Sequence, residues 1–310
     1  MIKTLTLNPA VDKTIIVEDF KIDNLNRVKE VYKDAGGKGI NVSKMINNLN
    51  GKTTATGFLG GYTGKYIKEE LDKMNIEHDF IEVEKETRTN IKMVDRSKKT
   101  FTDINENGAL VSKEKIQRLK SSIFSNLKED DILTLSGSVP KGLNDTIYAE
   151  IIEMAKEKKI ETILDADGNL FAEGVKAGPT LIKPNDHELS MYFNKDFKNL
   201  DEMIKAAQRF FDTGIEMVML SLGEKGAVFL NKEKKIKINP LQITVKSTVG
   251  AGDAMVAGLA LGMEKKLSAE EMVSLAAAAS SASLVNNGTE MGKKEEVEKF
   301  IEKIEISYIS

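Results

Sequence analysis

The chain of 310 residues is long enough for one large α/β domain or two smaller ones, and its 41% apolar and 30% charged residues are ordinary for a soluble globular protein. Its formal net charge is only −3 and charges of both signs are interspersed, so no electrostatic field favours nucleic acid or an anionic membrane as a partner. The absence of cysteine excludes disulfides, thiolate catalysis and a Cys-ligated zinc site, and two histidines, His78 and His187, are too few for a His-rich metal site.

The N-terminal residues 2–7 alternate and are rich in Thr, Leu and Ile, which predicts a strand that stops at Asn8-Pro9. This end of the chain lacks the apolar core of a signal peptide and no apolar run reaches membrane-spanning length, so we expect a cytoplasmic protein. Asp12 lies just beyond the strand end, where open α/β sheets hold their ligands. We therefore regard Asp12 as a candidate for binding substrate hydroxyls, with a turn-stabilising Asp as the alternative.

The glycine-rich segment 35–43 follows two short, highly charged strands expected at 14–17 and 28–34, which are too polar for the middle of a buried sheet. Backbone can approach a ligand closely in such a loop, and Lys38 and Asn41 supply a cation and an amide there. The loop is not a Walker A motif, and no set of glycines in the chain has the dinucleotide-binding spacing. The sequence therefore supports neither a P-loop nor a dinucleotide fold.

A strand at 53–60 and a helix at 65–74 precede Arg88, which opens a polar hairpin of strands at 90–95 and 100–104. Only five of the 45 basic residues are arginines. A guanidinium can bind phosphate oxygens in pairs, so an arginine beside a lid-like hairpin is a candidate for holding a substrate phosphate. The alternative is a solvated surface charge.

From residue 131 onward, expected strands and helices alternate along the chain. The expected strands are 132–136, 162–166, 181–183 and 217–222, with an edge hairpin at 226–230 and 235–238. The expected helices include 146–158, 186–192, 200–211 and 269–285. This order predicts a mainly parallel sheet with helices on both faces.

The segment 247–258 combines a glycine-rich turn, a helix start and a single acid. Gly250 and Gly252 leave the backbone free of side-chain bulk, and the small and apolar residues after them predict a buried helix. Its unpaired first-turn amides and the positive end of the helix dipole would form an anion site suited to a transferring phosphoryl group. Asp253 could accept a hydroxyl proton there while the amides stabilise the phosphoryl oxygens. The alternative is an Asp253 that only stabilises the helix end.

Three ordered motifs give the chain its resemblance to the ribokinase-like superfamily, and within it to the phosphofructokinase-B type sugar kinases. They are Gly36-Gly37-Lys38-Gly39-Ile40-Asn41-Val42, Asn185-Asp186-His187-Glu188 and Thr248-Val249-Gly250-Ala251-Gly252-Asp253. The resemblance covers essentially the whole chain and implies an α/β fold with a mainly parallel sheet, helices on both faces and a small β lid. It implies a lid at 12–34 and 88–107, and a large nucleotide-binding and catalytic region at 1–11, 35–87 and 108–310. Because such lids often mediate dimers, it also implies a homodimer through the lid.

The same resemblance implies roles for individual residues. Asp253 would be the catalytic base, and Glu188 would organise Mg²⁺ through water. The anion hole would be formed by Gly250, Ala251 and Gly252. The ATP site would be lined by Lys183, Asn185, Ser221, Gly223, Gly226, Thr248, Gly250, Gly252 and Asn286. The sugar-phosphate side would contain Asp12, Gly37, Lys38, Asn41, Arg88 and Asp253.

Three further segments, 6–12, 58–61 and 87–92, are similar to bacterial enzymes that phosphorylate fructose 1-phosphate. The implied reaction transfers a phosphoryl group from ATP to O6 of fructose 1-phosphate, giving fructose 1,6-bisphosphate and ADP. Tagatose-6-phosphate kinases share much of the pattern, because a ketohexofuranose carries a CH₂O group at both ends of its ring and can present either end.

Two functions of different classes compete with a sugar kinase. One is a non-catalytic sugar-phosphate sensor that keeps the fold, and the presence of both Asp253 and Glu188 argues against it. The second is an NAD-dependent dehydrogenase on a doubly wound sheet, and the chain lacks the glycine fingerprint of that class. The sequence therefore favours a kinase over a sensor and over a dehydrogenase.

Overall fold

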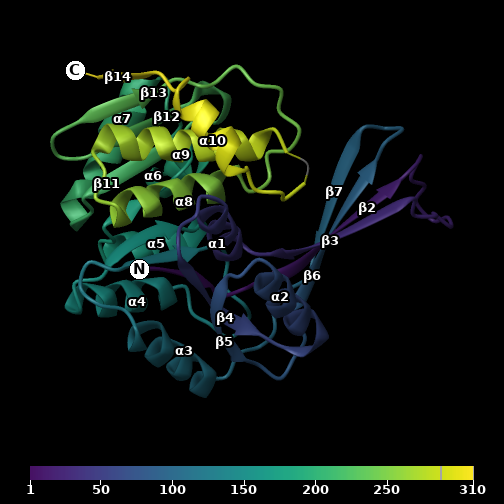
Figure 1. The fold of residues 1–310 in the computed structure, drawn as a ribbon. Helices are drawn as coiled ribbons and strands as arrows, with labels where there is room; N and C mark the ends of the chain where they lie inside the picture. The colour runs from purple at the N-terminus through teal and green to yellow at the C-terminus, as the bar shows by residue number, and fades with distance from the viewer. Residues whose placement is uncertain (287, 310) are drawn as a thin grey trace.

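A computed structural model describes residues 1–286 and 288–309, and within them a ten-stranded sheet forms the centre of the molecule (Figure 1). Across the sheet the strands follow the order β14 (Ile306–Tyr308), β13 (Lys235–Ile238), β12 (Ala227–Leu230), β11 (Met217–Ser221), β10 (Leu181–Ile182), β9 (Glu161–Asp165), β8 (Ile132–Ser136), β1 (Ile2–Thr6), β4 (Thr53–Leu59) and β5 (Glu77–Glu82). The strands from β11 through β5 pair in parallel, whereas β12, β13 and β14 pair antiparallel at one edge. The expectation of a mainly parallel sheet is confirmed.

Helices cover both faces of this sheet. One face carries α1 (Lys38–Asn48), α2 (Gly61–Lys73), α8 (Ala251–Glu264), α9 (Ala269–Leu284) and α10 (Lys294–Ile301). The other face carries α3 (Lys113–Ser125), α4 (Ile147–Glu157), α5 (Gly168–Lys176), α6 (Asp186–Phe193) and α7 (Leu200–Gln208). Short 3₁₀ helices at Arg209–Thr213 and Gly223–Lys225 flank β11. Strands buried on two faces need apolar side chains at successive positions, which is why they read as continuous hydrophobic runs.

Strand β8 illustrates how the alternation of side chains builds two cores from one strand. Ile132 belongs to the apolar core that includes α1, α8 and α9 side chains, while the next residue, Leu133, belongs to the core on the opposite face that includes α3 and α4 side chains. Both side chains are fully buried. Because the period of a strand is two residues, neighbouring strands contribute to the same two cores in the same way.

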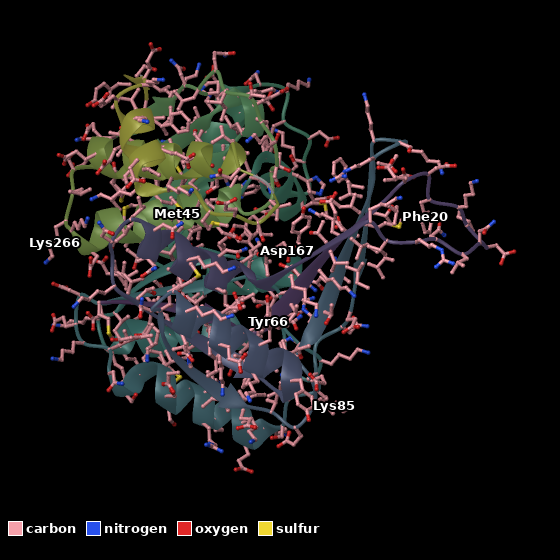
Figure 2. The ribbon with its side chains drawn as sticks, turned by 45° about the vertical axis from the view of Figure 1, so that its right-hand side comes forward. Phe20, Met45, Tyr66, Lys85, Asp167 and Lys266 are labelled. Atoms are coloured by element: carbon pink, nitrogen blue, oxygen red, sulfur yellow. The ribbon has the colours of Figure 1, made fainter. Side chains whose placement is uncertain are left out.

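A separate four-stranded sheet, which we call the lid, projects from one side of the molecule (Figure 1). Its order is β3 (Glu30–Gly36), β2 (Ala10–Val17), β6 (Arg88–Asp95) and β7 (Thr100–Asn105). Figure 2 shows Phe20 on the projecting lid and Asp167 in the body of the molecule. The lid strands overlap the two segments expected to form the lid, but β2 begins at Ala10 and β3 ends at Gly36, outside the expected 12–34. The exact division into lid and large region stays a prediction, and residues 287 and 310 of the expected large region lie outside the described residues.

The structure differs from the expected elements at several places. Asp12 lies inside β2, paired with Asp34 of β3 and Asn90 of β6, and not in a turn after β1. Helix α2 begins at Gly61, four residues before the expected start. The elements β5, α3, α10 and β14 were not expected. Among the described residues, none of the helices is both long and apolar enough to cross a membrane.

Candidate active site

The N-terminus of α8 is built so that its amides face outward without a side-chain cap. Gly250 precedes the helix with φ 79°, a left-handed conformation, and a Cβ at this position would lie 2.4 Å from Cε of Met291. Only glycine fits both constraints. In the described residues no side chain caps the helix start. Orphan amides at the positive end of a helix dipole can bind an anion, and this arrangement fits a phosphate group.

Asp253 lies in the first turn of α8 with its carboxylate buried. Asn41 of α1 donates a hydrogen bond from Nδ2 to Oδ2 of Asp253 at 2.8 Å. Burial disfavours the ionised carboxylate and Asp165 repels it, so the pKa of Asp253 is raised to about 6, although Lys38, Asn41 and Lys183 oppose the rise. A carboxylate whose pKa lies this close to neutral pH is suited to accept a proton during a reaction.

Asp165, at the carboxyl end of β9, holds two lysines of the site in place. Its Oδ1 lies 3.1 Å from Nζ of Lys183, and its Oδ2 lies 3.5 Å from Nζ of Lys38. Burial alone would raise the pKa of Asp165, but the two ammonium groups outweigh it and hold that pKa below its ordinary value. Asp165 therefore stays ionised and balances two cations. The sequence interpretation missed this residue.

Lys38 and Arg88 have different acidic neighbours, although both were expected on the sugar-phosphate side. The charge of Asp165, followed by those of Asp253 and Glu188, acts against burial and raises the pKa of Lys38. The acids near Arg88 are Asp12 and Glu106. The structure thus groups Lys38 with the expected base Asp253 and the expected metal-organising Glu188, and leaves Arg88 with the acids of the lid.

Glu188 belongs to the same charged group and also forms a capping box at the start of α6. Its Oε2 accepts a hydrogen bond from the amide of Asn185 at 2.9 Å, and its own amide donates to Oδ1 of Asn185 at 2.7 Å. Burial raises the pKa of Glu188, against the hydrogen bond from Asn185 and the charge of Lys183. The described residues hold no cluster of three or more His, Cys, Asp or Glu side chains that could bind a metal by themselves. A single carboxylate such as that of Glu188 fits Mg²⁺ that is held mainly through water and phosphate oxygens.

The other residues expected along the nucleotide lie at the end of β11, in the segments after β10, β11 and α9, and just before α8. Asn185 and Ser221 form a β-bridge, so these two candidates are adjacent. Gly223 and Gly226 have φ of 58° and 87° and shape the 3₁₀ turn after β11. Asn286 donates from Nδ2 to the carbonyl of Ala282 at 3.0 Å and to Oε2 of Glu296 at 3.2 Å. The side-chain amide of Asn286 thus already has two partners. Thr248 lies in the segment just before α8.

On the lid side, Asp12 is held between two neighbouring strands. Its Oδ1 accepts a hydrogen bond from Nδ2 of Asn90 at 3.0 Å. A Cβ on Gly36 would lie 2.0 Å from Oδ2 of Asp12, so the glycine is needed for the carboxylate to pack against its backbone. Gly37, the residue before α1, has φ 118° and faces Thr6 at the end of β1. Burial raises the pKa of Asp12, while Asn90, Lys44 and Arg88 oppose the rise.

Arg88 begins β6 and anchors its guanidinium on backbone carbonyls. Nε and Nη2 donate to the carbonyl of Asn8 at 3.2 and 2.9 Å, and Nη1 donates to the carbonyl of Glu106 at 3.3 Å. A guanidinium has five N–H groups, so about two remain for another acceptor. The carbonyl contacts fix the plane of the group. Arg88 is therefore arranged to bind an anion such as a phosphate.

Known proteins match this chain over nearly its whole length. The family model described as pfkB family carbohydrate kinase matches residues 5–295. A tagatose-6-phosphate kinase of Staphylococcus epidermidis is 38% identical over 313 residues, covering 99% of this chain and 100% of that protein. A 1-phosphofructokinase of Borreliella burgdorferi is 37% identical over 283 residues, covering 91% of each. The solved structure of phosphofructokinase-2 from Escherichia coli, in complex with substrates and products, matches with a TM-score of 0.93 and 30% identity over 97% of this chain and 98% of that one.

Proposed function

The chain belongs to the pfkB family of carbohydrate kinases, and we propose that its reaction within that family is the ATP-dependent phosphorylation of fructose 1-phosphate at O6. The observation that carries the proposal is the buried Asp253 in the first turn of α8, beside amides that no side chain among the described residues caps. A base and an anion site at one helix end are the two parts that phosphoryl transfer to a hydroxyl requires. The products are fructose 1,6-bisphosphate and ADP.

In this proposal Asp253 accepts the proton of the sugar O6 hydroxyl as that oxygen attacks the γ-phosphorus of ATP. The amides at Gly250, Ala251 and Gly252 stabilise the charge on the transferring phosphoryl oxygens. Asn41 fixes the carboxylate through its 2.8 Å hydrogen bond, so that the proton acceptor keeps one orientation. The raised pKa of Asp253, with burial as its main cause, supports this role because a base is most effective near its own pKa.

We assign ATP to the nucleotide-side residues and the remote phosphate of the sugar to Arg88. The ATP site comprises Lys183, Asn185, Ser221, Gly223, Gly226, Thr248, Gly250, Gly252 and Asn286. Asp12, Gly37 and Asn41 face the sugar. Lys38 was expected on the sugar-phosphate side, and its acidic neighbours Asp253 and Glu188 favour a place near the transferring phosphoryl group. Mg²⁺, bound with ATP and organised by Glu188 through water, would neutralise phosphate charge.

A coupled assay of ADP release across four sugars tests the substrate. We expect fructose 1-phosphate to give the highest kcat/KM, with tagatose 6-phosphate and fructose 6-phosphate lower and free fructose far lower. A remote phosphate that positions the reacting hydroxyl raises kcat as well as affinity, so the unphosphorylated sugar loses both. A higher kcat/KM with tagatose 6-phosphate would replace our substrate.

Tagatose 6-phosphate is the second candidate because relatives of both activities are nearly equally similar to this chain. The tagatose-6-phosphate kinase is 38% identical and the 1-phosphofructokinase is 37% identical. A difference of this size carries no information about the sugar. The product of the reaction would then be tagatose 1,6-bisphosphate, with the same base and the same anion site.

Replacing Glu188 by glutamine should raise the Mg²⁺ concentration for half-maximal rate about tenfold, a typical loss for a group that acts on a metal through an intermediate partner. The glutamine side chain keeps an oxygen for the amide of Asn185, so the α6 cap survives while the charge is lost. A Mg²⁺ titration of the initial rate measures the effect. Glu202 is a matched control, because it occupies the same position after the Asn199 cap of α7. Equal Mg²⁺ dependence in both variants would return Glu188 to a structural role.

We also propose that the protein acts in the cytoplasm. We further propose that two copies of the chain form a dimer through their lids. Large apolar side chains are exposed there, with Phe101 at 71% and Ile104 at 56% of their full accessibility. Apolar residues gathered on one sheet are typical of an interface. Sedimentation velocity over a range of protein concentrations measures the association, and a monomer at all concentrations would exclude the dimer.

A further inference from the structure

Lys44 is a buried lysine of α1 whose ammonium group reaches the root of the lid. Its Nζ donates a hydrogen bond to the carbonyl of Ala35 in β3, and its side chain is almost fully buried. Strand β3 is the edge strand of the lid, paired with β2 on one side only. Carbonyls at alternate positions of an edge strand are free for partners outside the sheet. Lys44 occupies one of them.

Tyr66 of α2 occupies the neighbouring free carbonyl. Its hydroxyl donates to the carbonyl of Lys33 at 2.9 Å. Two side chains from two different helices therefore fasten the same edge strand at positions two residues apart. Asp34 lies between these positions, and it pairs in register with Asp12 of β2. The carbonyls of Lys33 and Ala35 therefore lie on either side of Asp34, the residue that pairs with Asp12 of β2.

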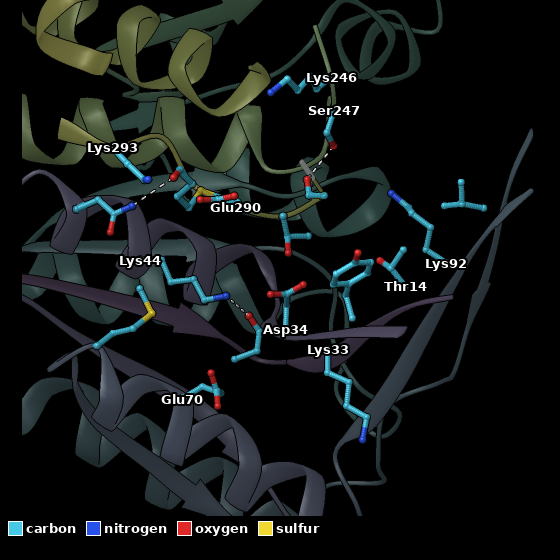
Figure 3. A pocket seen from close by; sticks show the side chains of 18 of the residues that line it. Thr14, Lys33, Asp34, Lys44, Glu70, Lys92, Lys246, Ser247, Glu290 and Lys293 are labelled. Atoms are coloured by element: carbon cyan, nitrogen blue, oxygen red, sulfur yellow. Dashed lines mark hydrogen bonds between the residues drawn. The ribbon is translucent and has the colours of Figure 1, made fainter. Parts of the chain in front are cut away.

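Lys44 also supplies a positive charge among acids from three elements. Burial lowers the pKa of Lys44, against the charges of Asp34 from β3, Asp12 from β2 and Glu70 from α2. Figure 3 shows Asp34 and Glu70 near the Lys44 ammonium group, along a cavity of about 1180 Å³ between the lid and the C-terminal part of the chain. An unpaired cation at this depth would be costly. The charges of these acids oppose the effect of burial, and the hydrogen bond to Ala35 holds the ammonium group.

The positive charge of Lys44 also acts on Asp12, the acid expected on the sugar side, together with several other groups. The groups that face Asp12 are Asn90 and Arg88 of β6, Asp34 of β3 and Lys44 of α1. Burial raises the pKa of Asp12, whereas the Asn90 hydrogen bond and the charges of Lys44 and Arg88 lower it. Helix α1 carries Lys44 one turn after Asn41, which holds Asp253. One helix thus carries a hydrogen bond to Asp253 and a charge that acts on Asp12.

We propose that Lys44 is a positioning residue of the sugar site, which fastens the root of the lid to α1 and places a positive charge beside Asp12, the acid that receives sugar hydroxyls. The inference rests on the proposed function, because it takes Asp12 as a sugar contact. Its two parts are separable. The hydrogen bond to Ala35 acts on the position of β3, and the charge acts on the ionisation of Asp12.

Four variants separate the two parts. Lys44→Gln keeps an N–H donor and removes the charge, Lys44→Met removes both, and Lys44→Arg keeps both. Tyr66→Phe removes the other fastening bond without changing a charge. At pH 8, we expect Lys44→Met to raise the KM for the phosphorylated sugar about tenfold, while kcat and the KM for ATP stay within about twofold, the range of an unaffected chemical step. Lys44→Arg should recover most of the lost affinity.

The ionisation of Asp12 is measured directly by ¹³C NMR of protein labelled at aspartate carboxyl carbons, with the Asp12→Asn variant to assign the signal. We expect Lys44→Gln to raise the titration midpoint of Asp12 by about one pH unit, since a nearby opposite charge typically lowers a carboxyl pKa by that amount or more. Tyr66→Phe should leave the midpoint in place. Lys52→Gln, at an exposed position, is the control for loss of a lysine charge.

An unmoved Asp12 midpoint in Lys44→Gln together with an unchanged sugar KM in Lys44→Met would overturn the proposal. If Lys44→Met does not fold, Lys44→Gln supplies both readouts. Asp12→Asn tests the underlying function on its own. A normal sugar KM in Asp12→Asn would remove Asp12 from the sugar site, while a shifted midpoint in Lys44→Gln would still establish the coupling between Lys44 and Asp12.

Discussion

Replacing Asp253 by asparagine should lower kcat by about 10² to 10⁴, the usual contribution of a general base, with little change in either KM. The amide has the shape of the carboxylate and can turn its oxygen toward Asn41, so the 2.8 Å contact survives. It cannot accept the hydroxyl proton. The wild-type rate should also fall as the pH drops through about 6, because burial places the pKa of Asp253 there and protonation removes the acceptor.

The loss of activity should not be accompanied by a loss of stability. Burial raises the pKa of Asp253 from 3.8 to about 6, so between these values the folded protein binds more protons at this site than the unfolded chain does. Stability therefore falls as the pH rises through this window and stays lower above it. Asparagine removes this penalty, and we expect the Tm of Asp253→Asn at pH 8 to equal or exceed that of the wild type.

Steady-state kinetics and thermal unfolding at pH 8 measure both effects. Asp201→Asn is the matched control, because Asp201 also lies in the first turn of a helix, α7, but is exposed. It should change neither kcat nor the pH profile. A near-normal kcat in Asp253→Asn would exclude Asp253 as the base.

The strands with two buried faces could be predicted closely from the sequence, whereas the partly exposed elements β5 and α3 were missed. The continuous apolar runs of β8 and β11 have a clear strand signal, and both strands lie close to their expected bounds. Strand β5 has the sequence Glu-His-Asp-Phe-Ile-Glu, since it forms an edge of the sheet and buries few side chains. Helix α3 is similarly polar, and Ser112 at its N-cap was the signal that could have found it.

The sequence indicates site residues at positions where the backbone conformation requires a particular residue type. It does not indicate residues whose role depends on contacts between side chains that are distant in the sequence. A left-handed turn before α8 requires glycine, which made the Gly250 segment visible in the sequence. Asp165 matters because it joins Lys38 and Lys183, which lie far from one another in sequence. The available signal was only an acid at the end of a buried strand. The side-chain direction of Lys38 depends on the packing of α1, which no spacing reveals.

Arg88→Ala should lower kcat/KM for fructose 1-phosphate about 100-fold or more. Each charge-assisted hydrogen bond from the guanidinium to the phosphate stabilises the bound sugar by about 1.5–3 kcal/mol, and the variant loses two such bonds. The phosphorylation of free fructose should change much less, since that sugar has no phosphate to lose. The preference for the phosphorylated sugar should therefore collapse. Arg88 also holds the carbonyls of Asn8 and Glu106, and any damage from losing these contacts would affect both sugars alike.

The ratio of the two kcat/KM values is thus the informative measurement, because it cancels structural damage and retains the phosphate contact. Arg118→Ala, at an exposed position of α3, controls for the loss of an arginine charge and should leave the ratio unchanged. An equal loss with both sugars would mean that Arg88 supports the lid and that the phosphate binds elsewhere. A loss confined to the phosphorylated sugar would place the remote phosphate against β6, at the opposite end of the sugar from the hydroxyl that we propose Asp253 deprotonates.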